Sequence, residues 1–288
     1  MLFADFELIQ RSYFAFFMPP ATQNLHNLSI AVTSTGNNRI LHEKASKLAD
    51  ALHISQIPQT EQENYNLLLV YTEKGLQIQL KEDKNKKSPA TLRVDFLSDS
   101  LSYRRQHGGG IKQALAKAVG IKPGIRPSIL DATAGLGKDS FLLASLGCKV
   151  VMIERSPLLA ALLNDGLERA AMSEKLAPSI INRLSLLQGD APAIIDENKN
   201  TQEEKPDTIY LDPMYPHSRK SALNKQDMRI IRELVGDDTD ADRLLQSALL
   251  YATKRVVVKR PKGASLLNDQ SPSHVIKMKN SRYDVYMI

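Results

Sequence analysis

The sequence predicts an α/β protein in which a small N-terminal α/β domain precedes a larger domain built on a mostly parallel sheet. From residue 129 onward, short apolar stretches alternate with helical patterns, which is typical of a parallel sheet covered by helices on both faces. A glycine-bearing turn follows the first of these stretches, as in nucleotide-binding α/β folds. Two apolar segments around Asn280-Ser281 predict a terminal antiparallel hairpin that closes the sheet.

The N-terminal part of the chain mixes strand and helix patterns. We expect residues 1–27 to be an extension of uncertain order and residues 28–100 to form the small α/β domain. Apolar residues at helical spacing predict a helix over 41–52. The polar, lysine-rich run 81–88 predicts a solvated loop. Strands are predicted at 29–33, 65–71, 76–80 and 91–96, with the second and third joined as a hairpin.

The larger domain is predicted to span residues 101–288. A helix ending at Val119 and a link rich in proline and glycine at 122–127 precede its sheet. Strands are predicted at 129–130, 150–153, 184–187, 208–211, 255–258, 275–278 and 283–287, and helices at 138–146, 157–171 and 241–252.

Composition limits the class of protein. With 288 residues, 42% of them apolar, the chain is long enough for two globular domains. The net charge of +6 favours a polyanionic partner. Cys148 is the one cysteine, so no internal disulfide can form, and we expect a buried thiol in a reducing, cytoplasmic setting. No run approaches the roughly 18 apolar residues of a membrane helix.

Acidic residues follow three successive predicted strands. Asp131 opens the turn Asp-Ala-Thr-Ala-Gly-Leu-Gly, in which Gly135 and Gly137 let the backbone approach a ligand closely. Glu154 ends the next strand and can accept hydrogen bonds from both hydroxyls of a ribose. Asp190 follows the third strand, where a carboxylate can receive an adenine amino group. Because ligands bind outside the carboxyl edge of such a sheet, the order of these acids predicts a nucleoside site.

The glycine turn has three alternative interpretations. It resembles an ordinary tight turn between a strand and a helix. A P-loop is disfavoured, because Ala132 replaces its first glycine and Asp139 stands where a magnesium-binding hydroxyl belongs. A dinucleotide dehydrogenase tolerates Ser140 at its third small position, but no proton-relay pair for hydride transfer is evident.

A second turn carries the candidate chemistry. Asp212-Pro213-Met-Tyr215-Pro follows the apolar stretch 208–211. An acid-Pro-x-aromatic turn at a strand end, downstream of a nucleoside site, is what a methyltransferase acting on a planar amino group needs. Methyl transfer from a sulfonium requires little more than a nucleophile aligned behind the methyl carbon. Asp212 and the carbonyl of Pro213 can accept hydrogen bonds from a planar amino group, which favours a more nucleophilic nitrogen. Tyr215 can stack on a base. The alternative is a helix cap or strand-end turn, with the tyrosine merely packing.

Basic residues near these turns are candidate RNA contacts, although several belong to runs that are equally typical of a solvated helix face. The candidates are Arg104, Arg105, His217, Arg219, Lys220, Lys259 and Arg260.

Four segments resemble the RsmJ family of small-subunit ribosomal RNA guanine-N2 methyltransferases. They are Asp131 to Asp139 (DATAGLGKD), Leu211 to His217 (LDPMYPH), Lys220 to Leu223 (KSAL) and Ala252 to Pro261 (ATKRVVVKRP), within a match over roughly residues 100–288. The resemblance implies a Rossmann-like class I methyltransferase fold, S-adenosylmethionine as cofactor, no metal, and one guanine near the 3′ end of 16S rRNA. It implies cofactor contacts at Lys138-Asp139, Glu154-Arg155, Asp190-Ala191 and Asp212.

Two alternatives stay open. DNA adenine and protein amides also present planar amines, and a non-catalytic RNA-binding assembly factor can retain the fold. The resemblance implies 16S rRNA or the small ribosomal subunit as the partner.

Overall fold

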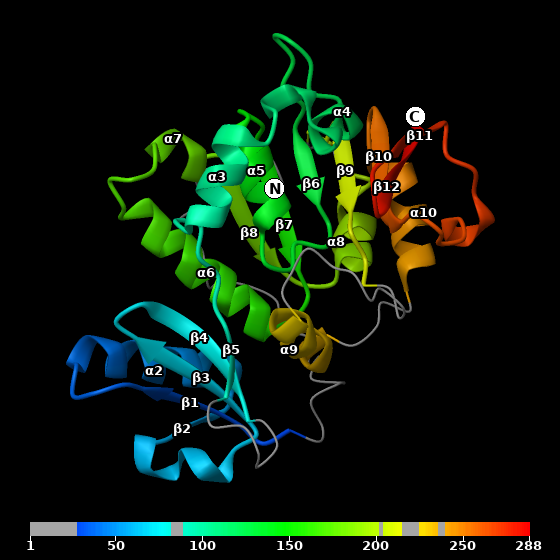
Figure 1. The fold of residues 1–288 in the computed structure, drawn as a ribbon. Coiled ribbons are helices and arrows are strands. Elements are labelled where there is room, and N and C mark those ends of the chain that lie inside the picture. The colour runs from blue at the N-terminus through cyan, green and yellow to red at the C-terminus, as the bar shows by residue number, and fades with distance from the viewer. Residues whose placement is uncertain (1–27, 82–88, 202–203, 215–224, 236–239) are drawn as a thin grey trace.

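A computed structural model describes residues 28–81, 89–201, 204–214, 225–235 and 240–288, and these residues form two sheets (Figure 1). The smaller sheet has the strand order β2-β1-β3-β4-β5, and the larger has the order β11-β12-β10-β9-β6-β7-β8. Residues 1–27, which we expected to form an extension, and residues 82–88 of the predicted loop 81–88 lie outside the described residues.

The smaller sheet agrees with most of the predicted elements. Its strands and helix are β1 (Ile30–Ser34), α2 (Arg39–Leu52), β2 (Ser55–Gln56), β3 (Leu67–Thr72), β4 (Gly75–Leu80) and β5 (Ala90–Leu92). The predicted hairpin is confirmed, because β3 and β4 are antiparallel with Thr72 opposite Gly75. The strand predicted over 91–96 is too long, since β5 ends at Leu92 and the chain then runs toward α3.

The larger sheet confirms the predicted mostly parallel architecture with a terminal antiparallel hairpin. Its strands are β6 (Ile129–Asp131), β7 (Val150–Glu154), β8 (Leu184–Gln188), β9 (Thr208–Leu211), β10 (Arg255–Pro261), β11 (His274–Lys277) and β12 (Ser281–Met287). Strands β8, β7, β6, β9 and β10 are parallel to one another, and β12 pairs antiparallel with both β10 and β11. The chain moves outward from β6 to β8 and returns at β9, so the strand order reverses between β6 and β9. Ligands bind at such a reversal in open α/β sheets.

Alternate residues of the strands pack against opposite faces of the larger sheet. Ile129 belongs to an apolar cluster on one face, and the next residue, Leu130, belongs to a cluster on the other. Helices α5 (Lys138–Ser145) and α6 (Pro157–Ala171) contribute to the first cluster, and α8 (Ala191–Asn198) and α10 (Ala241–Tyr251) to the second. Cys148 is fully buried in the first cluster, where burial raises the pKa of its thiol to about 12.

The two sheets meet at α6. The Asp165 carboxylate accepts hydrogen bonds from the Leu76 backbone N–H (3.0 Å) and from Arg169 Nε (2.7 Å), and Arg169 also donates to the Val94 carbonyl. A Cβ at Gly166 would lie 2.7 Å from Val94 Cγ1, so only glycine permits this approach. One apolar cluster contains residues of both sheets. The domain boundary near residue 100 stays a prediction.

Candidate active site

The glycine-bearing turn joins β6 to α5 at the carboxyl edge of the larger sheet. Gly135 and Gly137 have φ of 55° and 67°, a left-handed conformation that glycine adopts without steric cost. The Ala134 N–H donates to the Ile153 carbonyl at 3.0 Å, which ties the turn to the end of β7. A Cβ at Gly137 would lie 2.8 Å from Leu163, whereas one at Gly135 would meet only the Thr133 carbonyl, at 4.0 Å. Gly135 therefore faces open space, and Gly137 faces the core.

Glu154 and Asp190 lie at the carboxyl ends of the next two strands, Glu154 as the last residue of β7 and Asp190 two residues after β8. Glu154 is 5% exposed, and its carboxylate accepts hydrogen bonds from the backbone N–H groups of Gly135 and Ser156, both at 2.8 Å. Asp190 is the N-cap of α8 and accepts from the Ala193 N–H at 3.4 Å. Both carboxylates are thus held by backbone donors at the edge where a ligand would lie.

Asp131 is buried beneath the glycine turn. Its carboxyl accepts hydrogen bonds from the Ser140 hydroxyl at 2.5 Å and from the Thr133 N–H at 3.2 Å. Burial, only partly offset by these two donors, raises the pKa of Asp131 to about 7. The residue therefore supports the turn from inside and is partly protonated near neutral pH.

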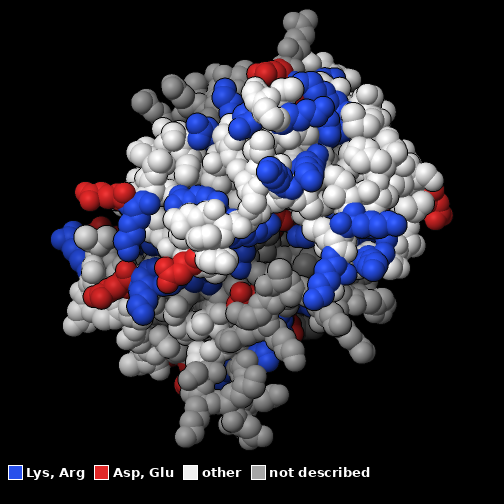
Figure 2. All heavy atoms as spheres, turned by 45° about the horizontal axis from the view of Figure 1, so that its top comes forward, with Lys and Arg blue, Asp and Glu red and all other residues white. Residues whose placement is uncertain are grey.

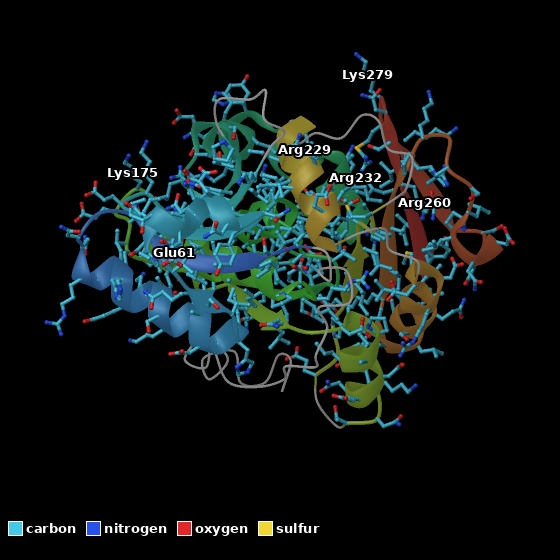
Figure 3. All side chains as sticks on the ribbon, turned by 90° about the horizontal axis from the view of Figure 1, so that it is seen from below. Glu61, Lys175, Arg229, Arg232, Arg260 and Lys279 are labelled. Atoms are coloured by element: carbon cyan, nitrogen blue, oxygen red, sulfur yellow. The ribbon has the colours of Figure 1, made fainter. Side chains whose placement is uncertain are left out.

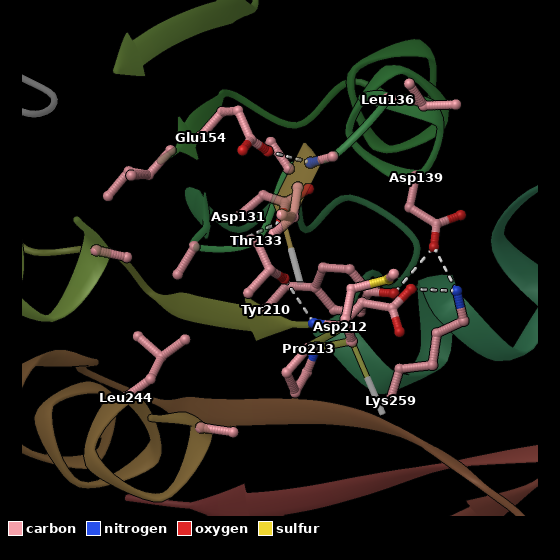
Figure 4. A pocket seen from close by; sticks show the side chains of 18 of the residues that line it. Asp131, Thr133, Leu136, Asp139, Glu154, Tyr210, Asp212, Pro213, Leu244 and Lys259 are labelled. Carbon is pink, nitrogen blue, oxygen red and sulfur yellow. Dashed lines mark hydrogen bonds and ion pairs between the residues drawn. The ribbon is translucent and has the colours of Figure 1, made fainter. Parts of the chain in front are cut away.

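A charge network joins the two predicted motifs (Figure 4). Lys259 Nζ lies 2.6 Å from Asp212 Oδ2 and 3.2 Å from Asp139 Oδ2. The Tyr210 hydroxyl donates to Asp139 at 2.9 Å, and Arg104 lies 2.9 Å from the same carboxylate. Two acids from different motifs are therefore held together by one lysine of β10.

The network fixes the ionisation of its members. Burial alone would raise the pKa of Asp139, but Lys259, Arg104 and the Tyr210 hydroxyl outweigh it and lower this pKa to about 2. Burial acts to lower the pKa of Lys259, and the attraction of Asp212 and Asp139 raises it above its ordinary value instead. Both carboxylates of the network face a lysine that stays charged at neutral pH.

The second motif also contacts the first through the backbone. The Asp212 N–H donates to the Thr133 hydroxyl at 2.6 Å, directly linking the turn after β9 to the glycine turn after β6. Pro213 is buried and Met214 is half-buried beside them. The acid-proline turn and the glycine turn thus share one site, as the sequence predicted.

These groups line one cavity of about 1030 Å³. This volume is at the upper end of the usual range for small-molecule pockets. The predicted residues that line it are Arg104, Asp131, Gly135, Lys138, Asp139, Glu154, Arg155, Asp190, Ala191, Asp212, Pro213, Lys259 and Arg260. Gly137 supports the turn from the core, and Arg105 is half-buried on α3 (Asp99–His107) outside the lining. Tyr215, His217, Arg219 and Lys220 lie outside the described residues.

The basic residues predicted to contact RNA differ in their surroundings. Arg104 and Lys259 are paired with acids of the network. Arg260 is 4% exposed and donates to the Ser265 carbonyl at 2.6 Å. Arg155, predicted to contact the cofactor, forms an ion pair with Asp240 at 3.3 Å. Contact of these residues with RNA or cofactor stays a prediction.

Several lining residues were not identified from the sequence. Tyr210 reads as an apolar member of a buried strand, and only the pairing of β9 with β6 brings its hydroxyl to Asp139. Thr133 gave no signal beyond its place in the glycine turn. The cavity is also lined by Ile231 and Val235 of α9 (Lys225–Val235), Leu244 of α10, and Met278 to Ser281 of the β11–β12 turn.

None of the helices within the described ranges is long and apolar enough to cross a membrane. The same residues contain no group of three or more His, Cys, Asp or Glu side chains arranged to hold a metal ion.

Comparison with known proteins defines the class. The SAM_MT family model of SAM-dependent methyltransferases matches residues 48–288. A crystal structure of a SAM-dependent methyltransferase from Neisseria gonorrhoeae is 34% identical, with a TM-score of 0.66, and covers 90% of this chain and 95% of its own. The Rossmann-like methyltransferase fold that the sequence predicts is therefore confirmed.

Curated relatives narrow the family. Ribosomal RNA small subunit methyltransferase J of Aeromonas salmonicida is 49% identical over 251 residues, which cover 87% of this chain and 97% of the relative. The protein of the same name from Ectopseudomonas mendocina is 50% identical over 244 residues, covering 85% and 89%. The chain belongs to this RsmJ family, and it is a SAM-dependent methyltransferase.

Proposed function

We propose that this chain transfers a methyl group from S-adenosylmethionine to the exocyclic N2 of a guanine in 16S rRNA, acting in the cytoplasm. One observation carries the proposal: Asp212 and Pro213 share a cavity with the glycine turn, and the Asp212 N–H bonds directly to Thr133 of that turn. The names of the relatives support ribosomal RNA as the substrate. The choice of guanine N2 rests on the sequence resemblance to the RsmJ family. No distance in the cavity selects it.

The cavity fits the cofactor at the positions that the sequence predicted. A Cβ at Gly135 would occupy open space in the cavity, so glycine leaves room for a ligand there. Glu154 would hold the ribose, and Asp190 with Ala191 would face the adenine. Apolar side chains, among them Ile153 and Leu244, line the same cavity and suit a flat base. When bound, S-adenosylmethionine supplies an electrophilic methyl group on a sulfonium.

Asp212 and Pro213 would position the amino group that receives the methyl. A carboxylate has roughly four acceptor sites, so the bond from Lys259 leaves Asp212 capacity for an amine N–H. The Pro213 carbonyl offers a second acceptor, and two such bonds favour the more nucleophilic, pyramidal nitrogen. Because the sulfonium leaves as a neutral thioether, no general acid is required, and the proton of the methylated nitrogen passes to water.

The substrate must present its base outside a helix. Guanine N2 points into the minor groove when paired, so the enzyme requires an unpaired or extruded base, at a cost of a few kcal/mol. Figure 2 shows Lys and Arg side chains around a hollow on one face of the molecule, which suits a polyanionic substrate. Stacking of Tyr215 on the base remains a prediction.

Transfer of labelled methyl to ribosomal RNA that lacks the mark tests the proposal. Nucleoside analysis should show N2-methylguanosine; label in adenine, in protein or in nothing would contradict it. Asp212→Ala should abolish transfer while RNA binding stays within a few-fold of wild type. Asp50→Ala, an equivalent change at an exposed position of α2, serves as the control and should leave turnover unchanged.

A further inference from the structure

One wall of the cavity consists of a loop and a turn that are held together by two arginines, Arg260 and Arg282. The loop is 261–265, after β10, and the turn is 277–281, from the last residue of β11 to the first residue of β12. Pro261 and Met278 to Ser281 line the cavity. The Lys262 N–H donates to the Asn280 carbonyl at 3.2 Å, so loop and turn form one surface, which we call the lysine wall.

Arg282 is the main support of the lysine wall. It donates to the carbonyls of Pro261, Lys262 and Ala264 at 3.3, 2.9 and 2.8 Å. It also forms a two-point ion pair with the fully buried Asp284, at 2.7 and 3.0 Å. Two donors from one planar guanidinium to one carboxylate fix the direction of the side chain as well as its position.

Arg260 supports the same loop from the neighbouring strand. It lies opposite Arg282 in the β10–β12 ladder, and both side chains donate to the Ser265 carbonyl, Arg260 at 2.6 Å and Arg282 at 3.4 Å. Like charges directly opposite each other normally destabilise a sheet. Here Asp284 and the loop carbonyls offset that repulsion, and both arginines hold the loop against β10 and β12.

The lysine wall carries exposed cations. Lys262, Lys277 and Lys279 are exposed, whereas Arg260 is buried. Figure 3 labels Lys279 on the β11–β12 hairpin and Lys175 on the opposite side of the molecule. Lysines on a backbone that is already held cost less backbone ordering for each phosphate bound than lysines on a mobile loop.

We propose that the lysine wall binds the phosphates of the RNA strand that flank the target base, through Lys262, Lys277 and Lys279. This inference rests on the proposed function, because the wall lines the same cavity as Asp212 and Pro213. The sequence predicts RNA contacts at Lys259 and Arg260 of β10, whereas this inference assigns the contact to Lys262, which follows β10.

Loss of the three charges tests the proposal. In the variant Lys262→Gln, Lys277→Gln, Lys279→Gln, we expect the Kd for a 16S rRNA 3′ fragment to rise about 10- to 100-fold. The slope of log K against log salt should become shallower by about 2, since each single-strand phosphate contact contributes about 0.7. The kcat at saturating RNA should stay within twofold. The control variant Lys47→Gln, Lys74→Gln, Lys175→Gln removes equal charge from exposed positions elsewhere.

A second pair of variants tests the wall without removing a lysine. A Cβ at Gly263 meets nothing within 4 Å, and its φ is not in the left-handed region. Gly263→Glu should weaken RNA binding several-fold, whereas Gly263→Gln, of nearly equal size, should not.

The outcomes separate the two proposals. Equal loss of binding in the lysine-wall variant and in the control, or no loss in either, would overturn the inference and leave the proposed function standing. A wild-type protein that binds the RNA through this wall but never methylates it would instead refute the proposed function.

Discussion

Lys259→Met is the most informative change in the site, because one lysine holds the carboxylates of both motifs. Its Nζ lies 2.6 Å from Asp212 and 3.2 Å from Asp139. After the substitution, Asp139 keeps Arg104 and the Tyr210 hydroxyl, whereas Asp212 loses the lysine that orients it. Lys259 is therefore a positioning residue.

The expected loss of turnover follows from misplacement of Asp212. A shift of about 1 Å in a positioning group costs about 100-fold in rate, which equals about 2.7 kcal/mol of activation free energy. The effect on stability should be smaller than the 3–5 kcal/mol of a fully buried pair. The Asp212 side chain is 37% exposed, so solvent screens its share, and about 1–3 kcal/mol is expected.

The assay is single-turnover methyl transfer with labelled S-adenosylmethionine, accompanied by calorimetric binding of S-adenosylhomocysteine. We expect kcat to fall about 100-fold with cofactor affinity within a few-fold of wild type. Lys259→Arg should recover part of the rate, because it keeps the charge but not the point geometry. Lys254→Met is the matched control, since it removes an ion pair with Asp207 just before β10.

The pH dependence of stability tests the ion pair between Lys259 and Asp139. The Lys259 ammonium helps to depress the pKa of Asp139 to about 2, below the unfolded value of about 3.9. The stability from this interaction is present above pH 4 and is lost as pH falls toward 2. The stability difference between wild type and Lys259→Met should therefore be constant above pH 5 and shrink below pH 4. Equal kcat values in the two proteins would refute the reasoning.

Three further predictions concern the surrounding residues. Burial raises the pKa of Asp131 to about 7, so the stability that its protonation provides is lost as pH rises from 4 to 7; Asp131→Asn should be stabilising at pH 8 but not at pH 4 in urea unfolding. Gly137→Ala should cost about 2–4 kcal/mol of stability through strain and overlap with the core. Gly135→Ala should cost only about 1 kcal/mol yet weaken S-adenosylhomocysteine binding, and equal stabilities would contradict this contrast. Arg282→Met should cost about 3–5 kcal/mol, because it leaves Asp284 buried without its ion pair, and an unchanged urea midpoint would count against that role.

The helices and strands that could be predicted are marked by residues within them or directly beside them. The predicted bounds of α6 coincide with those observed, because Ser156 caps the helix and Pro157 occupies its first turn. The strand predicted over 208–211 coincides with β9, a fully buried run. Helix α3 was missed, since only Leu101 among its residues is buried and no apolar periodicity appears. Helix α8 was missed because Asp190 was interpreted as a ligand contact, and its role as a cap was not considered.

The candidate site was predictable where the chain order alone determines position. Acids after successive parallel strands must meet at one edge of the sheet, so Asp131, Glu154 and Asp212 were found together. The partners of those acids were not predictable. Lys259 and Asp139 are 120 residues apart in the chain, and their contact depends on the register of β10 against β9.

The end of β10 connects the turn that would position the amino group with the lysine wall that would bind the RNA. Lys259 points into the cavity and holds Asp212, and the chain then turns at Pro261 into the loop that carries Lys262. Successive residues of a strand point to opposite faces of the sheet. Lys259 and Arg260 therefore leave β10 on opposite faces, and Arg260 donates to the loop. A displacement of β10 would therefore disturb both the acceptor turn and the lysine wall. We expect Arg282→Lys, which keeps the charge but loses the two-point pair with Asp284, to lower kcat and weaken RNA binding together; a change in only one would show that the strand does not transmit between them.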